Sequence, residues 1–145
     1  MKKLLIITTL AAAFTHATLA QPKDLSLQVK EIETPTISNG LFQQISISNP
    51  VVITEAESAS QYLTGAQLNT VQSLDFTKKK VLAFFWLGSG KDKLTFSISE
   101  KSPKHATFTR HLGRTKDSVK RMKVFILEKD MTYQISNFRK PEQSN

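Results

Sequence analysis

The stretch "VLAFFWLGSGKDKLTFSIS", from Val81 to Ser99, decides the fold. In residues 81–87 apolar side chains occupy both the odd and the even positions, which is typical of a strand that is covered on both faces. Residues 93–99 instead alternate between apolar and polar side chains, the pattern of a strand with one buried face. The stretch therefore predicts a central strand followed by a half-buried one. Trp86, Phe84 and Phe85 are expected to belong to the core rather than to an exposed stacking platform.

The two strands are separated by Gly88-Ser89-Gly90-Lys91-Asp92. Two glycines in three positions permit tight turns and close approach of another backbone. The primary interpretation is a hairpin turn that joins two paired strands. The alternative is a loop whose backbone N–H groups bind an anionic group beside Lys91. A phosphate-binding P-loop is not indicated, because the glycine spacing differs and a strand follows the loop.

Working outward, the remaining chain is predominantly strand-like, with one helical region. Strands are predicted at residues 25–33, 41–48, 51–53, 104–112, 121–129 and 132–136. A helix is expected to begin at Thr54, with Glu57 completing a capping box, and to end at Gly65; a second short turn of helix covers residues 66–71. The pattern predicts an α+β domain with a mainly antiparallel, curled β-sheet and one or two short helices. A small β-sandwich is the alternative.

The N-terminal residues "MKKLLIITTLAAAFTHATLA" have the three parts of a secretory signal peptide: two lysines, a short apolar run, and small residues before a cleavage point after Ala20. We therefore expect a signal peptide at 1–20, a single domain at 21–136 and a polar tail at 137–145. Localisation is expected to be periplasmic or secreted. The chain has no cysteine, which excludes a lipid-modified cysteine and disulfide bonds.

Charge is distributed unevenly along the mature chain. Residues 21–76 contain 2 basic and 6 acidic side chains, whereas residues 77–145 contain 16 basic and 6 acidic ones. A basic C-terminal half indicates an acidic partner, such as nucleic acid, a glycan, anionic lipid or an acidic protein. The preferred interpretation is that the lysines are solubilising residues scattered over exposed strand faces, because they do not form one long block.

A second unusual loop lies in "HLGRTKDSVKR", residues 111–121. Gly113 allows the chain to turn after the strand at 104–112. If that strand forms a hairpin with residues 93–99, the second loop returns to the same end of the sheet as Gly88. Asp92 would then pair with Arg114, and Asp117 would brace Lys91.

The two loops together form the predicted binding rim. Its members are Gly88, Ser89, Gly90, Lys91, Asp92, Gly113, Arg114, Thr115 and Asp117. In the alternative reading as a polyanion site, Lys116, Lys120 and Arg121 join the basic residues of this rim. A structural role as a loop-locking ion pair remains open beside the binding role.

No residue pattern indicates catalysis, a metal or a cofactor. His105 and His111 lie six residues apart on one face of a predicted strand, roughly 20 Å along it, which is too far for one metal ion. Ser89 between glycines does not match a nucleophile elbow, which needs a following helix and a partner histidine. The sequence therefore predicts a protein that is not an enzyme. A hydrolase would require Ser89, Asp92 and His111 to converge.

Two motifs carry a resemblance over residues 52–130. The stretches W-x-GSG-x-D-x-L, at Trp86 to Leu94, and GRT-x-D, at Gly113 to Asp117, resemble those of a group of uncharacterised exported bacterial proteins. More distantly, residues 75–88 are similar to the PrcB-like domain of protease-complex accessory proteins, although Ser89-Gly90-Lys91-Asp92 replaces the Gly-Gly-Tyr-like turn usual there. The resemblance implies an exported, non-enzymatic domain.

Together these observations predict an exported accessory module that binds another envelope or secreted protein through the two loops. Binding of a polyanion through the basic C-terminal half is the alternative function. No stable insertion into a membrane is expected.

Overall fold

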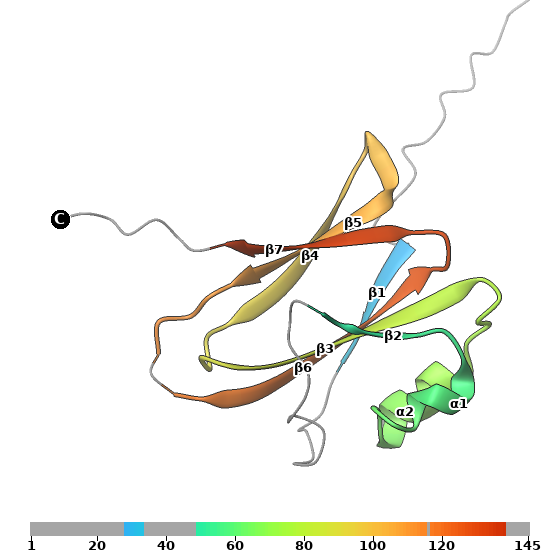
Figure 1. Cartoon of the computed structure of the whole chain (residues 1–145), viewed down its shortest axis with the longest axis horizontal. Helices are drawn as coiled ribbons and strands as arrows, with labels where there is room; N and C mark the ends of the chain where they lie inside the picture. Colours follow the sequence, from blue (N-terminus) through green and yellow to red (C-terminus); the bar gives the residue numbers. More distant parts are fainter. Residues whose placement is uncertain (1–27, 34–48, 116, 139–145) are drawn as a thin grey trace, which may run out of the picture.

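The computed structural model describes residues 28–33, 49–115 and 117–138 (Figure 1). The elements are β1 (Val29–Ile32), β2 (Val51–Ile53), α1 (Ala56–Ala59), α2 (Gly65–Gln72), β3 (Lys79–Gly88), β4 (Lys93–Ser99), β5 (Ser102–His111), β6 (Val119–Glu128) and β7 (Thr132–Phe138). Every strand predicted within this part of the chain is confirmed. The predicted signal peptide, the predicted strand at 41–48, Lys116 and residues 139–145 lie outside the described residues.

The strands form two sheets. The first has the order β1-β6-β3-β2, with every neighbouring pair antiparallel. The second has the order β4-β5-β7, in which β4 and β5 are antiparallel and β5 and β7 are parallel. The predicted α+β class with mainly antiparallel strands and two short helices is confirmed. The parallel pair was not foreseen, because the sequence around Tyr133 indicates a strand but not its partner.

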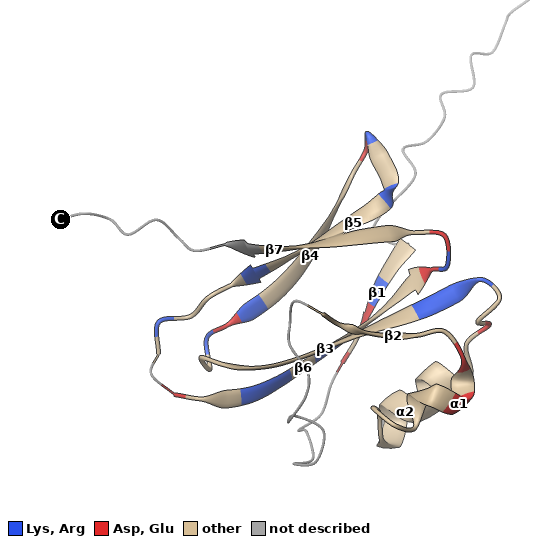
Figure 2. Ribbon diagram, viewed as in Figure 1, with Lys and Arg blue, Asp and Glu red and all other residues tan. Residues whose placement is uncertain are grey.

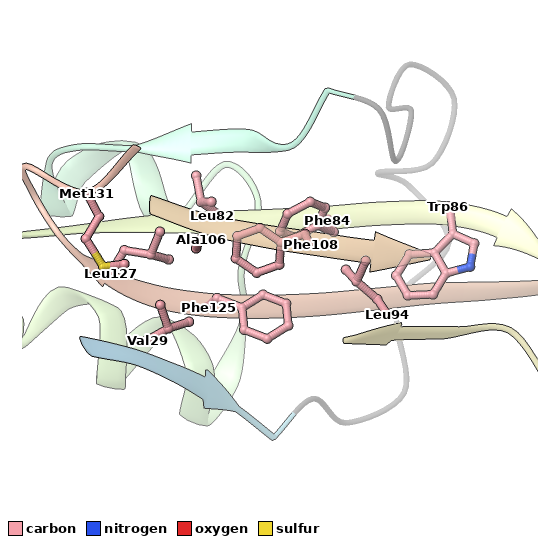
Figure 3. Close-up of a cluster of buried hydrophobic side chains, with 10 residues drawn as sticks. All are labelled: Val29, Leu82, Phe84, Trp86, Leu94, Ala106, Phe108, Phe125, Leu127 and Met131. Carbon is pink, nitrogen blue, oxygen red and sulfur yellow. The ribbon is translucent and has the colours of Figure 1, made fainter. Parts of the chain in front are cut away.

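The main core lies between the two sheets (Figure 3). Phe84 and Phe125 of the first sheet contact Phe108 of the second, with ring centroids 4.9 Å from Phe108 in both cases. Trp86 and Leu94 close this cluster at one end, where Trp86 is only 3% exposed. The expectation that Trp86 and Phe84 are core residues is confirmed.

A second core lies between the other face of the first sheet and the two helices. Phe85 is fully buried there, and Ala59, Leu63 and Val71 cover it from the helical side. Residues 81–86 are therefore buried on both faces of β3, as the apolar pattern predicted. The helices lie near the start of β3, away from its Gly88 end (Figure 1).

The hairpin interpretation of the Gly88–Asp92 segment is wrong. β3 pairs with β6 and β2, and β4 pairs with β5, so the segment carries the chain from one sheet to the other. The physical reason is that both faces of β3 are apolar, so the helices cover one face and a second sheet has to cover the other. β4, with a single apolar face, instead supplies part of the sheet that covers β3.

The predicted helix from Thr54 to Gly65 is also wrong in its bounds. α1 ends after one turn at Ala59, and its N-cap residue is Glu55, which makes no side-chain capping bond. Gly65 begins α2 instead of ending a helix, with a φ of 59° that a residue with a side chain rarely adopts. The predicted second helix at residues 66–71 is confirmed within α2.

Within the described residues, none of the helices has the length and apolar character needed to cross a lipid bilayer.

Candidate binding site at the loop end

The two unusual loops lie at the same end of the molecule (Figure 1). The first, residues 89–92, joins β3 to β4; the second, residues 112–118, joins β5 to β6. β4 and β5 form the predicted hairpin, with Lys93 opposite His111, and this pairing returns the chain to the first loop. The prediction that the loops are neighbours is confirmed. We call these loops and the adjoining strand ends, residues 86–94 and 110–121 except 116, the loop end.

Ser89 joins the two loops through its hydroxyl group. Its Oγ is hydrogen-bonded to Oγ1 of Thr115 and accepts the backbone N–H of Thr115 at 3.3 Å. The same oxygen accepts the N–H of Lys91 at 3.1 Å, within its own loop. Ser89 is therefore placed to order both loops.

Asp92 is the buried centre of the loop end, with an exposure of 4%. Its Oδ2 accepts a hydrogen bond from Nη2 of Arg110 at 2.7 Å, and its Oδ1 accepts the N–H of Gly113 at 2.7 Å. The predicted pairing of Asp92 with Arg114 is wrong. Arg110 lies on the inward face of β5, directly opposite Leu94, whereas the Arg114 side chain is exposed in the second loop.

These contacts hold the Asp92 carboxyl group in its charged form. Burial alone would raise its pKa, but the hydrogen bond and charge of Arg110, with the N–H of Gly113, outweigh burial and lower the pKa below its usual value. The Trp86 indole N–H makes a smaller contribution in the same direction, although it forms no well-aligned hydrogen bond within the described residues.

Asp117 makes a second link between the loops. Its Oδ2 accepts the N–H of Gly90 at 3.0 Å. Hydrogen bonds from the Thr115 side chain and from Gly90 lower the pKa of the Asp117 carboxyl group. The predicted bracing of Lys91 by Asp117 is wrong, because no ion pair joins them in the described part of the chain. The carboxylate bonds the backbone of the first loop instead.

Glycine is required at the points where the loops interlock. A Cβ atom on Gly88 would lie 2.2 Å from Oδ2 of Asp92, and one on Gly113 would lie 2.4 Å from Oγ of Ser89 and 2.7 Å from the Lys91 backbone. The glycines of the sequence motifs therefore serve close approach between the loops.

The surface of the loop end is both basic and apolar. Leu87, Leu112 and Val119 are exposed by 59%, 39% and 37%, and they are three of the four exposed large hydrophobic residues in the described part of the chain. Basic residues lie on the strand ends and loops at this end of the molecule (Figure 2). The described basic residues here are Lys91, Lys93, Arg110, Arg114, Lys120 and Arg121, against two acidic ones, Asp92 and Asp117.

The groups needed for a hydrolase each have a different partner. Ser89 bonds Thr115, Asp92 bonds Arg110, and Nε2 of His111 lies 3.0 Å from Oγ1 of Thr95. The described contacts therefore do not assemble a Ser89–His111–Asp92 relay. Within residues 28–33, 49–115 and 117–138, no three histidine or acidic side chains gather in a group that could hold a metal ion.

Sequence reasoning missed Arg110 as a member of the site. The signal was present: Arg110 follows Ala106 and Phe108 on the apolar face of its strand, and a charged residue there needs a buried partner. Three buried donor atoms were missed as well, namely Nε1 of Trp86 and Nε of Arg110 and Arg121, which have no hydrogen-bond partner in the described structure.

Comparison with known proteins finds no matching family model, no matching curated protein and no matching solved structure.

Proposed function

We propose that this protein is an exported, non-catalytic accessory module that binds an acidic protein partner through the loop end. The observation that carries this proposal is the coincidence of exposed apolar and basic side chains. Leu112 and Val119, on the β5–β6 connection, share one end of the molecule with an excess of basic residues, and Leu87 lies at the same end on the other face of the first sheet. Protein interfaces commonly combine an apolar centre with a polar or charged rim.

The rigidity of the loop end supports the same function. Hydrogen bonds of Ser89, Asp92 and Asp117 fix both loops to each other and to β5. A surface that is already ordered loses little conformational entropy on binding, so more of the contact energy appears as affinity. Binding residues are often found on loops that a rigid scaffold positions.

Export rests on the signal-like residues 1–20, and the accessory role is consistent with the resemblance to exported bacterial proteins and to the PrcB-like domain. An envelope or secreted protein is therefore the class of partner that we expect.

Replacing Leu112 by aspartate tests the surface directly. We expect Leu112→Asp to reduce the partner recovered by chemical cross-linking from envelope extract at least tenfold, because it replaces an exposed apolar side chain by a negative charge that repels an acidic partner. Val52→Asp is the matched control, since Val52 is similarly exposed at 44% but lies on edge strand β2. Equal recovery with both variants would show that the loop end is not the interface.

Binding of a polyanion is the second candidate, favoured by the exposed side chains of Lys91, Lys93, Arg114 and Lys120 at the loop end. Counterion release makes such binding steeply dependent on salt. If it is the function, the affinity for heparin or DNA should fall roughly tenfold or more between 50 and 200 mM salt. Leu112→Asp should then reduce this affinity no more than a lysine-to-glutamine change does. Affinity that is absent or insensitive to salt removes this candidate.

A further inference from the structure

Three buried donors without an acceptor lie at the loop end. They are Nε1 of Trp86 and the Nε atoms of Arg110 and Arg121, and they are the only buried side-chain polar atoms without a hydrogen-bond partner in the described part of the chain. Buried polar groups are almost always hydrogen-bonded, to protein, to an ordered water or to an ion. All three are donors at one end of the fold, and the Trp86 N–H, which acts on Asp92, forms no well-aligned bond to it; together they indicate a place for a further acceptor.

The sheet registers direct these side chains toward the space between the sheets. Trp86 is directly opposite Arg121 on β3 and β6, on the face that carries Phe84 and Phe125. Arg110 is opposite Leu94 on β5 and β4, on the face that carries Phe108. Trp86 stands at the end of the core with its indole nitrogen turned away from the other nine side chains of the cluster (Figure 3).

The charges in this region do not balance. Asp92 is the buried carboxylate of the loop end, and its two oxygens accept hydrogen bonds from Nη2 of Arg110 and the N–H of Gly113. Arg121 forms no ion pair in the described part of the chain. The second carboxylate, Asp117, interacts with Arg121 only through its charge, so the Nε donors of both guanidinium groups still lack an acceptor.

The site remains connected to the surface. The Arg110 side chain is 18% exposed, and Arg121 is partly buried rather than enclosed. An anionic group can therefore approach over the guanidinium groups, next to the exposed residues Leu112 and Val119. Guanidinium groups bind carboxylates through paired, charge-assisted hydrogen bonds.

We propose that Arg121, Arg110 and the Trp86 indole N–H form a carboxylate-binding site at the loop end, which receives an aspartate or glutamate side chain of the partner. This inference rests on the proposed function, because it names the chemical group of the partner that the loop end recognises. Arg121 is the main ligand, since Arg110 is already engaged by Asp92.

The protein carries its own reporter, because Trp86 is its only tryptophan. A single indole N–H resonance therefore reports on the site by NMR. We expect an acetylated tetraglutamate peptide, titrated into the mature protein, to shift this resonance saturably, whereas a tetraglutamine peptide leaves it unmoved. Arg121→Gln should weaken the peptide's affinity about tenfold, and the same loss of charge in Lys101→Gln, at the exposed turn between β4 and β5, less than twofold.

Further variants and ligands define the outcome. Arg121→Lys retains the charge but loses the Nε donor, and we expect it to weaken binding nearly as much as Arg121→Gln. Equal affinity in Arg121→Gln and Lys101→Gln, or an unmoved indole resonance, would overturn the proposal. Inorganic phosphate that binds as tightly as the peptide would overturn the carboxylate assignment. Acetate that binds as tightly as the peptide would retain the carboxylate site but identify a small free acid as its ligand.

The two proposals fail in different ways. If Leu112→Asp removes the partner while the tetraglutamate peptide leaves the Trp86 resonance unmoved, the carboxylate site is wrong and the proposed function stands. If the peptide binds and the partner is unaffected by Leu112→Asp, the site stands as a small-ligand site and the proposed protein interface is wrong.

Discussion

Phe108→Ala is expected to destabilise the protein by about 4 kcal/mol, the typical cost of removing a fully buried phenylalanine. Phe108 is completely buried and contacts Phe84 and Phe125, so it joins the second sheet to the first. The truncation removes apolar contacts from both sheets and leaves a cavity between them. Urea unfolding followed by circular dichroism measures the change in the free energy of unfolding.

Phe96→Ala is the control for this substitution. Phe96 also packs on the core, with its ring 6.2 Å from that of Phe108, but it is only partly buried. We expect a smaller loss of roughly 1–2 kcal/mol. If Phe108→Ala costs no more than Phe96→Ala, the two sheets do not pack on each other in the way described.

Asp92→Asn is expected to destabilise the protein by about 3 kcal/mol and to lower the midpoint of thermal unfolding by roughly 10 °C. The substitution removes the charged partner of Arg110, whose side chain is only 18% exposed, and leaves that guanidinium group without compensation. Asp130→Asn is the matched control, because the Lys104–Asp130 pair is largely exposed. Exposed pairs contribute little, so this control should leave the midpoint nearly unchanged. Similar midpoints for the two variants would contradict the stabilising role of the buried Asp92–Arg110 ion pair.

The pH dependence of stability follows from the same carboxyl group. The pKa of Asp92 is lower in the folded state than in the unfolded chain, where it is about 3.9. The Asp92 contribution is therefore fully present above the unfolded pKa and is lost as the pH falls toward the folded value. The stability difference between wild type and Asp92→Asn should shrink on acidification below about pH 4. A constant difference across that range would show that the charge of Asp92 is not what stabilises the loops.

The sequence indicated the individual strands more reliably than it indicated which strands pair with each other. The apolar residues on both faces correctly predicted a buried strand over 81–86, but Leu87, which was also expected to be covered, is 59% exposed. The same residues do not specify which strand lies beside β3. The chain changes sheets after Gly88, so a loop with the composition of a hairpin turn is a connection between layers.

The same limit explains the errors in the candidate site. The proximity of the two loops followed from the length of the β4–β5 hairpin and was predicted correctly. The partner of Asp92 was predicted wrongly, because only residues of the second loop were considered as partners and the adjoining strand β5 was not. Arg110 was already placed with Ala106 and Phe108 by strand alternation, and a charged residue on that face was the signal that it pairs inside. The position of Trp86 opposite Arg121 depends on the β3–β6 register, which a single sequence does not determine.

The proposal that the loop end is the binding surface is tested most directly by photo-cross-linking at single positions. A photoreactive amino acid is placed at Leu112, and in a second variant at Val52, the similarly exposed apolar residue on β2. Each variant is produced in the cells that make the protein, irradiated, and analysed for covalent adducts. We predict a discrete protein adduct at Leu112 and none at Val52. Adducts at Val52 alone, or at neither position, would contradict the assignment of the loop end as the interface.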